Sequence, residues 1–269
     1  MLDAVARDGL VLLGCGKMGT ALLTGWLAAG VPATSVWVIE PNPSDWLKST
    51  GVHVNEALPK SPAVALVAVK PQMMGAALPA LQAMGNGRTL FVSIAAGTSI
   101  ATFAAVLGAW TPIVRTMPNT PAMVGRGITG ICGNAYAGAL GLATAKALMQ
   151  AVGEVVELSG EAQIDAVTAL SGSGPAYVFH LIEAMAAAGA AEGLPADVAM
   201  KLARATVCGA GELAYRAPES AAQLRINVTS PGGTTAAALV HLMDPDTGLA
   251  SLMRRAVHAA AERGRELGK

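Results

Sequence analysis

The chain has 269 residues, 53% of them hydrophobic and 13% charged, and its 18 basic side chains equal its 18 acidic ones. Such a balance offers no basic surface to a nucleic acid or an anionic membrane, so we expect neither as a partner. The apolar content suffices for a large core and two domains. The three cysteines are far apart and in no zinc-like spacing, which predicts reduced thiols in a cytoplasmic protein without a bound metal.

One uncharged segment, residues 89–114, is long enough to cross a bilayer. It is interrupted by Gly97-Thr98-Ser99, however, and contains a proline near its end. We therefore interpret it as a buried strand followed by a buried helix. The first residues, "MLDAVARDG", lack the basic start and apolar core of a signal peptide.

The first half of the chain alternates short apolar runs with alanine-rich stretches. Strands are expected at residues 10–14, 35–40, 64–69, 89–95 and 112–117, and further on at 127–132 and 154–158. Helices are expected to begin near Met18, Ser44, Gln72 and Ser99, with another over about 139–152. Strands that are apolar throughout are typical of a parallel sheet covered on both faces. This half is therefore predicted to be an α/β domain with a Rossmann-type, doubly wound parallel sheet.

Strand signals stop after about Ser159, and the rest of the chain reads as helices separated by glycine- and proline-containing breaks. This change predicts a dinucleotide-binding domain over 1–160 and an all-helical domain over 161–269. The helix "AYVFHLIEAMAAAGAAEG", residues 176–193, has few polar positions around its circumference. We expect its burial to require a second subunit, which predicts a homodimer formed through the C-terminal domain.

The stretch "GCGKMG", Gly14 to Gly19, follows an apolar strand and precedes a helix, as a dinucleotide-binding fingerprint requires. In this interpretation Gly14 makes the tight turn, Gly16 lets the backbone approach the pyrophosphate, and Gly19 lets helix and strand pack closely. The alternative is that the glycines serve only a turn. Glu40 ends the next strand, where an acidic side chain can accept hydrogen bonds from the adenine-ribose hydroxyls.

Three further motifs follow strands, at the edge where open α/β sheets bind ligands: "AVKP", "AAG" and "MPNTP". Lys70 of the first could reach a cofactor ribose or phosphate, or could simply be solvated. The small residues Ala95 and Ala96 of the second would let a nicotinamide ring lie against the backbone. Asn119 of the third could border that ring, or could be a turn former.

A second loop, "NVTSPGGTTAAAL" from Asn227 to Leu239, places a proline, two glycines and two threonines before an alanine-rich helix. A helix start of this kind binds anions through its free N–H groups and dipole. Two interpretations are open: a site for an anionic substrate, or an ordinary capped helix with an entry turn.

Taken together, the motifs "GCGKMG", "AVKP", "SIAAG", "MPNTP", "DAVTALSGSGPAYVF" and "NVTSPGGTT" resemble the pyrroline-5-carboxylate reductase family from Val11 to the last helix. The resemblance implies reduction of 1-pyrroline-5-carboxylate to L-proline with NADPH or NADH, the last step of proline biosynthesis. It also implies an N-terminal Rossmann domain and a helical C-terminal domain that dimerises and in some members assembles further.

The resemblance also implies roles for individual residues. Substrate contacts would fall on Glu161, Ser230, Gly233, Thr234 and Thr235. Cofactor contacts would fall on Gly14, Cys15, Gly16, Lys17, Met18, Gly19, Asn55, Val69, Lys70, Ala95, Ala96 and Asn227. Glu40 and Pro71 join this set from their places after strands and not from the resemblance. Thr235 is also the candidate catalytic residue from its place at the start of the helix after the second loop, where its hydroxyl is free to meet the imine nitrogen or the carboxylate.

Two other functions were weighed. A β-hydroxyacid-dehydrogenase-like reductase would need a lysine shortly after the start of the first C-terminal helix, and "SGSGPAYVFHLIEAM" contains none. A non-catalytic nicotinamide-nucleotide sensor would have no use for an anion-binding helix start in its second domain. His180, in the same stretch, is interpreted as a core histidine and not a catalytic one.

The choice between NADH and NADPH depends on Glu40. Many relatives have serine, threonine or arginine at this point, whereas a carboxylate repels the 2′-phosphate of NADPH. Asn42, Ser44 or Lys48 could still bind that phosphate, and Glu40 could turn outward into solvent. The sequence predicts that NADH is usable and that any preference for NADPH is weaker than in relatives.

Overall fold

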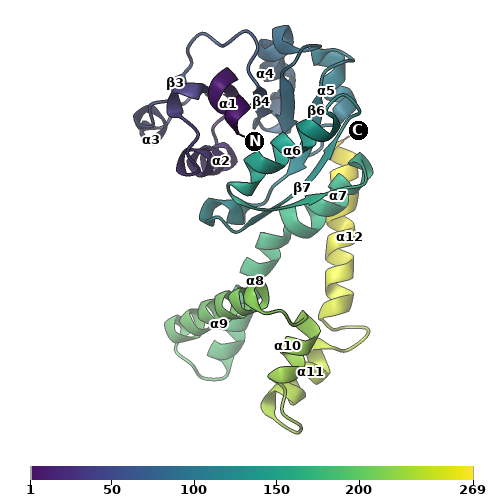
Figure 1. Ribbon diagram of the computed structural model, residues 1–269. Coiled ribbons are helices and arrows are strands. Elements are labelled where there is room, and N and C mark those ends of the chain that lie inside the picture. The colour runs from purple at the N-terminus through teal and green to yellow at the C-terminus, as the bar shows by residue number, and fades with distance from the viewer. Residues whose placement is uncertain (1, 269) are drawn as a thin grey trace. The chain divides into compact units, whose positions relative to one another are not determined.

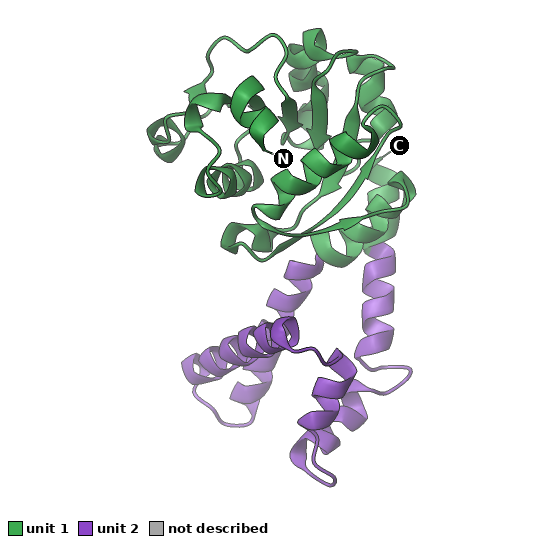
Figure 2. Ribbon diagram, in the orientation of Figure 1, with its two compact units in different colours: residues 1–172, 260–269 green, residues 173–259 purple. Residues whose placement is uncertain are grey.

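The computed structural model describes residues 2–268, which form two compact units (Figure 2). Unit 1 contains residues 1–172 and 260–269, and unit 2 contains residues 173–259. Residues 161–172 and 260–269 thus belong to the unit that carries the sheet, whereas the sequence placed the domain boundary at 160/161. Within the described residues no helix is both long and apolar enough to cross a membrane.

Unit 1 is built on an eight-stranded sheet with the order β3-β2-β1-β4-β5-β6-β7-β8 (Figure 1). The first six positions follow the Rossmann order, with a switch point between β1 and β4. The five main predicted strands and the two later ones are all present. The strands are β1 (Leu10–Leu13), β2 (Val36–Ile39), β3 (His53–Val54), β4 (Val64–Val67), β5 (Leu90–Ser93), β6 (Ile113–Met117), β7 (Gly127–Gly133) and β8 (Gly153–Glu157).

The sheet is not parallel throughout, because β7 pairs antiparallel with β6. Only residues 118–126 connect these two strands, and they form the short 3-10 helix η4 (Thr120–Val124). A parallel connection needs a crossover of a dozen residues or more, so a link of this length brings the chain back in the opposite direction. Strand β8 then runs parallel to β7, with helix α6 (Gly138–Gln150) as the crossover.

Helices cover both faces of the sheet in unit 1, as the apolar strands predict. Along β1, Leu10 and Leu12 face one core, which includes residues of α2 (Lys17–Ala28) and α6. Val11 and Leu13 face the other, which includes residues of η3 (Leu78–Met84) and α5 (Ile100–Leu107). Smaller helical elements are α1 (Asp3–Asp8), η1 (Ala33–Ser35), α3 (Asp45–Ser49), η2 (Pro71–Met73), α4 (Met74–Ala77), η5 (Glu161–Gln163), α7 (Ile164–Val167) and the π-helical turn η6 (Thr168–Gly172).

Side-chain hydrogen bonds explain where several of these helices begin. Ser44 and Ser99 accept hydrogen bonds from the backbone of Leu47 and Thr102, so both are N-caps, next to the predicted helix starts. The buried indole of Trp26 donates to the carbonyl oxygen of Leu148 over 2.9 Å, which joins α2 to α6. The short strand β3 and helix α1 were not predicted.

Unit 2 consists of helices alone, as predicted: α8 (Gly174–Ala191), α9 (Ala196–Arg216), α10 (Ala221–Asn227), α11 (Thr234–Leu242) and the first part of α12 (Leu249–Leu267). Helices α8 and α9 pack through small residues, since Ala186, Ala199 and Ala203 are the buried ones. The link between them turns at Gly193, whose φ of 96° lies in the left-handed region that glycine tolerates.

Candidate active site

The glycine loop follows β1 and leads into α2, as the fingerprint requires. Gly14 has a φ of 90°, and a Cβ atom there would lie 2.9 Å from the carbonyl oxygen of Ala68 on the neighbouring strand end. A Cβ atom on Gly19 would lie 2.6 Å from the carbonyl oxygen of Gly14, so helix and loop meet closely. At Gly16 a Cβ atom would meet nothing within 4 Å. Gly14 and Gly19 therefore have the turn-forming and close-packing roles that the sequence predicted, and the position at Gly16 is open.

Helix α2 begins with N–H groups that no side chain caps. Its N-cap residue is Gly16, and its first turn, which includes Lys17, contains no acidic residue. Free N–H groups at the start of a twelve-residue helix favour an anionic group. The loop and helix start thus fit a dinucleotide pyrophosphate, and the open space over Gly16 leaves room for it.

The other predicted cofactor residues of unit 1 follow strands at the same, carboxyl edge of the sheet. Val69, Lys70 and Pro71 follow β4, with the Lys70 side chain exposed. Ala95 and Ala96 follow β5, and the N–H group of Ala95 donates to the hydroxyl of Ser93. The structure therefore brings these residues to the edge where Rossmann folds bind their cofactors.

Asn119 was expected either to border the nicotinamide ring or to form a turn, and its contacts in the structure are those of a turn residue. The residue is 7% exposed, and its side-chain oxygen Oδ1 accepts a hydrogen bond from the N–H group of Ile128 over 2.9 Å. This bond joins the turn after β6 to the start of β7. We therefore interpret Asn119 as the residue that holds the turn between the two antiparallel strands.

Glu40 is turned toward the glycine loop and not into solvent. One carboxylate oxygen accepts a hydrogen bond from the N–H group of Cys15 over 2.8 Å, and the other accepts one from the N–H group of Asn42 over 3.0 Å. Two backbone donors thus hold the carboxylate between the end of β2 and the loop after β1. The outward orientation considered in the sequence is not the one observed.

Asn55, which follows β3, holds the backbone of the same glutamate. Its side-chain oxygen accepts from the N–H group of Glu40 over 2.9 Å, and its side-chain nitrogen donates to the carbonyl oxygen of Glu40 over 2.8 Å. Asn55 has a φ of 55°, a left-handed conformation that asparagine tolerates better than most residues. The sequence named both residues but not the link between them, which depends on the unpredicted strand β3.

The second loop lies in unit 2 and leads into α11. A hydrogen bond from the N–H group of Gly233 to the carbonyl oxygen of Ser230 closes a turn, with Pro231 in its second position and Gly232, at a φ of 69°, in its third. This is the arrangement that a type II turn favours. Gly233 is the N-cap of α11 and provides no side chain to cap it. The first N–H groups of α11 are therefore free for an anion.

Thr234 and Thr235 are the first two residues of α11, and no hydrogen bond within the described residues involves their hydroxyl groups. Thr235 is half-buried and Thr234 is exposed. The loop therefore presents free N–H groups and two free hydroxyls together.

Asn227, the predicted cofactor residue of unit 2, ends α10. Its side-chain oxygen accepts a hydrogen bond from the side chain of Gln223 over 2.8 Å.

Glu161 lies in unit 1, at the start of η5, in contacts that differ from those expected of a substrate residue. One of its carboxylate oxygens accepts from the guanidinium of Arg115 and from the N–H group of Ile100, each over 2.7 Å. Arg115 is 6% exposed, and its Nη2 atom has no hydrogen-bond partner. The pair joins β6 to the start of α5. Arg115 was missed, although a lone arginine inside the apolar run "PIVRTM" was a visible signal.

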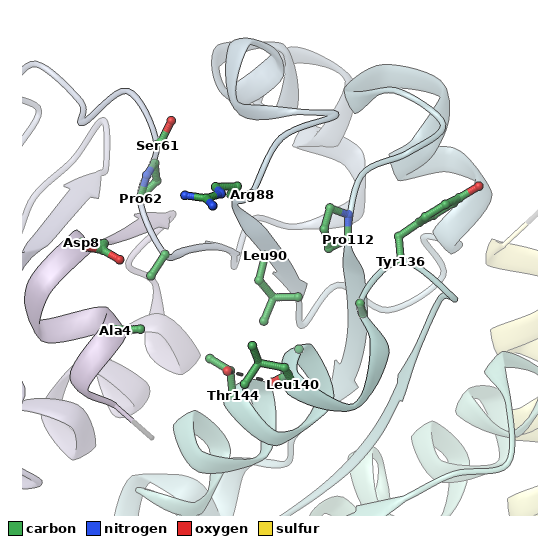
Figure 3. Close-up of a pocket in the computed structure, with 13 residues that line it drawn as sticks. Ala4, Asp8, Ser61, Pro62, Arg88, Leu90, Pro112, Tyr136, Leu140 and Thr144 are labelled. Carbon is green, nitrogen blue, oxygen red and sulfur yellow. Dashed lines mark hydrogen bonds between the residues drawn. The ribbon is translucent and has the colours of Figure 1, made fainter.

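A cavity of about 610 Å³ lies at the opposite, amino edge of the sheet (Figure 3). Arg88, Leu90 and Pro112 line it where β5 and β6 begin, together with Leu140 of α6. None of the predicted site residues lines it. Because ligands of open α/β sheets bind at the carboxyl ends of the strands, the glycine loop and its neighbours remain the candidate cofactor site.

Comparison with known proteins gives the same assignment. Residues 161–267 match the family described as "Pyrroline-5-carboxylate reductase dimerisation", and residues 10–97 match "NADP oxidoreductase coenzyme F420-dependent". The pyrroline-5-carboxylate reductase of Pseudomonas aeruginosa is 40% identical over 97% of each chain. The chain belongs to the pyrroline-5-carboxylate reductase family.

Solved structures of the family have the same fold. A pyrroline-5-carboxylate reductase from Coxiella burnetii matches with a TM-score of 0.91 at 34% identity, over 97% of this chain and 99% of that one. The Plasmodium falciparum pyrroline carboxylate reductase, solved with NADP bound, matches with a TM-score of 0.83 at 28% identity, over 98% and 99%. The predicted fold class is confirmed, with the correction at β7.

Membership of the family confirms the predicted activity. The chain is an NAD(P)H-dependent oxidoreductase that reduces the C=N bond of pyrroline-5-carboxylate. The two alternatives weighed from the sequence, a β-hydroxyacid-dehydrogenase-like reductase and a non-catalytic nucleotide sensor, are set aside. The family match at 161–267 also identifies a dimerisation domain, so the chain forms a homodimer.

Proposed function

We propose that the two glycine-containing loops divide the reaction between them, with the loop of unit 1 binding NAD(P)H and the loop of unit 2 binding the substrate carboxylate. The observation that carries this proposal is the presence of two uncapped helix starts, α2 and α11, each after a glycine turn. A dinucleotide and an imino acid each carry one anionic group that such a start can bind.

In unit 1, the cofactor-binding residues would be those at the carboxyl edge of the sheet. The pyrophosphate would lie against the N–H groups of Lys17, Met18 and Gly19 at the start of α2, over the open position at Gly16. Lys70 is exposed and would be free to reach a ribose or phosphate. The turn containing Ala95 and Ala96 would border the nicotinamide ring. The reduced cofactor supplies the hydride when bound.

In unit 2, the substrate carboxylate would accept hydrogen bonds from the N–H groups of Thr234 and Thr235 at the start of α11. A bound anion gains about 0.3–2 kcal/mol from a helix N-terminus. The turn from Ser230 to Gly233 would keep side chains away from this position, because Gly233 offers no Cβ atom. The carboxylate is thereby oriented without a cationic residue.

Thr235 would serve the imine nitrogen or the carboxylate through its hydroxyl group. Protonation of an imine makes the adjacent carbon strongly electrophilic, so the chain needs only to orient the ring and supply a hydrogen bond or proton to nitrogen. The Thr235 hydroxyl is half-buried and takes part in no hydrogen bond within the described residues. It therefore remains available as a donor to the substrate.

The C-terminal helices would form the dimer interface, with further assembly of dimers an additional step, and the enzyme would act in the cytoplasm without a nucleic acid or membrane partner. Exposed large apolar side chains on every helix of unit 2 support such an interface. Cys15, Cys132 and Cys208 are free thiols, which suits a reducing compartment.

A substrate analogue without the carboxylate tests this division of roles. We expect kcat/KM for 1-pyrroline to be lower than that for 1-pyrroline-5-carboxylate by about tenfold or more, because hydrogen bonds to a charged group contribute about 1.5–3 kcal/mol. A Thr234→Pro variant, which removes one of the N–H groups at the start of α11 at a helix position where proline is tolerated, should lose part of this difference. Equal kcat/KM values for the two imines in the unaltered enzyme would contradict the proposal.

A further inference from the structure

We infer that Asn55 is a positioning residue that holds the Glu40 carboxylate where it selects NADH against NADPH. The inference rests on the proposed function, in which the glycine loop binds the cofactor. It goes further by proposing that Glu40 determines cofactor specificity and that the hydrogen bonds of Asn55 hold Glu40 in place. The resemblance to the family implied only that Asn55 contacts the cofactor.

The position of the Glu40 carboxylate is determined at three points. Its two oxygens accept from Cys15 in the glycine loop and from Asn42, at 2.8 and 3.0 Å. The Glu40 backbone is held separately, by the two ends of the Asn55 amide at 2.9 and 2.8 Å. Glu40 thus makes four hydrogen bonds, to Cys15, Asn42 and Asn55. The orientation of its carboxylate is therefore defined before any cofactor binds.

The carboxylate keeps free acceptor positions for a ribose. Two carboxylate oxygens offer about four lone-pair positions, and the two backbone donors occupy two of them. The remaining positions can accept from the two hydroxyl groups of an adenine ribose. A 2′-phosphate can offer no such pair of donors, and it brings at least one negative charge next to the carboxylate.

Two of the donors near Glu40 that could receive a 2′-phosphate already have a partner. The N–H group of Asn42 donates to Glu40 itself. Lys48 pairs with Asp45 at 3.4 Å. The segment from Glu40 to Lys60 contains no arginine. The local charges therefore favour a ribose without a phosphate.

Asn55 is suited to this role by its backbone as well as its amide. Its N–H group continues the ladder of the parallel pair β2–β3 by donating to the carbonyl oxygen of Val38 over 2.8 Å. Its φ of 55° then lets the side chain fold back onto Glu40, the residue that follows β2. Substitution by glycine keeps this backbone conformation and removes only the amide.

Fluorescence titration of the enzyme with NADH or with NADPH, in the absence of an imine, tests the inference. The quantity compared is the ratio of the Kd for NADPH to the Kd for NADH. Glu40→Gln keeps the shape and removes the charge, and we expect it to lower this ratio by about tenfold, because a carboxylate and a nearby phosphate repel each other even near the surface. Glu56→Gln, which removes an exposed carboxylate that pairs with His53, is the matched control and should leave the ratio unchanged.

Asn55→Gly separates a positioning role from direct contact. We expect it to move the ratio toward that of Glu40→Gln, and to add no further change when combined with Glu40→Gln, since both act through the same carboxylate. If Asn55→Gly weakens NADH and NADPH equally, it contacts the cofactor directly and the inference is overturned. An unchanged ratio in Glu40→Gln also overturns it, whereas failure of both nucleotides to bind the unaltered enzyme contradicts the proposed cofactor site itself.

Discussion

The two units of the chain differ in how much apolar surface each hides by itself. Unit 1 contains all three clusters of buried apolar residues, and both faces of its sheet are covered. In unit 2 the buried apolar residues are alanines alone, among them Ala186, Ala199 and Ala203, and large apolar side chains are exposed along every helix, as with Phe179 at 61% and Val240 at 70%. Unit 1 can therefore be stable through its own core, whereas unit 2 requires a covering surface.

This difference explains the division of roles along the chain. The proposed cofactor residues of unit 1 lie at the edge of a sheet and are held by hydrogen bonds, as with Glu40 between the glycine loop and Asn55. The proposed substrate loop belongs to a unit whose apolar side chains must be covered by a second copy, in agreement with the dimerisation family matched at 161–267. Assembly should thus affect unit 2 far more than unit 1.

The largest effect is expected where this covering is prevented. Ala187 is exposed on α8 in the single chain, and Ala187→Asp would place a charge in the apolar interface. We expect the dimer to dissociate and pyrroline-5-carboxylate reduction to be lost, with cofactor binding retained. Ala105→Asp, on an exposed position of α5 in unit 1, is the control. Sedimentation velocity measures the dimer state of both variants, and enzyme assays measure their activity. A fully active Ala187→Asp monomer would contradict the claim that unit 2 needs a second subunit.

Within unit 1 the largest effect is expected at the buried ion pair. Glu161→Ala leaves the Arg115 guanidinium buried without a charged partner and removes the acceptor for the N–H group of Ile100. We expect a loss of about 3 kcal/mol in the free energy of unfolding, at the low end for such pairs because a third of Glu161 is exposed. Urea denaturation measures it.

The same position decides between a structural and a substrate-binding role for Glu161. Glu161→Gln keeps an oxygen for Arg115 and Ile100, so stability should fall less than in Glu161→Ala. With a structural role alone, KM for pyrroline-5-carboxylate stays unchanged in Glu161→Gln. A KM raised by tenfold, about 1.4 kcal/mol, would restore the substrate contact that the resemblance implied.

In unit 2 the Thr235 hydroxyl tests whether the second loop takes part in the reaction. Thr235→Ala should lower kcat/KM by about 1–3 kcal/mol in transition-state stabilisation, because one hydrogen bond to the substrate is lost. NAD(P)H binding should not change, since the cofactor residues lie in unit 1, apart from Asn227. Thr235→Ser retains the hydroxyl and should retain most of the activity. An unaltered kcat/KM in Thr235→Ala would remove the residue from the mechanism.

The smallest effect concerns the glycine loop. Burial raises the pKa of the Cys15 thiol above its usual value, so the reactive thiolate is scarcer at neutral pH than in a free cysteine. We expect slow alkylation of Cys15 by iodoacetamide at pH 7 that accelerates as the pH rises toward that elevated pKa. Mass spectrometry of a Cys208→Ser variant, with glutathione as the reference thiol, measures the rates. Alkylation of Cys15 as fast as glutathione at pH 7 would show that the loop is open.

The sequence was most informative where a local pattern determines the structure. Apolar runs identified the main strands of unit 1, and the geometry confirms the tight turn at Gly14 and the close packing at Gly19. The antiparallel β7 followed from a connection too short for a crossover, a feature that was visible but not used. Strand β3 has only two residues, too few for any period to appear.

Contacts between distant segments could not be predicted in the same way. The hydrogen bonds from Asn55 to Glu40 and from Arg115 to Glu161 join residues that are adjacent only after the sheet is assembled. No spacing in the sequence identifies such pairs. For the same reason the contacts of the Glu161 carboxylate with Arg115 and the start of α5 were not predicted, and its role in substrate binding stays a prediction.

Transfer of an isotope label tests the central claim, that this chain reduces the imine with a hydride from a nicotinamide cofactor bound by unit 1. The enzyme is supplied with pyrroline-5-carboxylate and with NADH or NADPH that carries two deuterium atoms at C4 of the nicotinamide, and the product is analysed by mass spectrometry. We predict proline with one deuterium on the ring carbon that was part of the C=N bond, and no oxidation of the cofactor without the imine. Unlabelled proline, or no proline at all, would contradict the account.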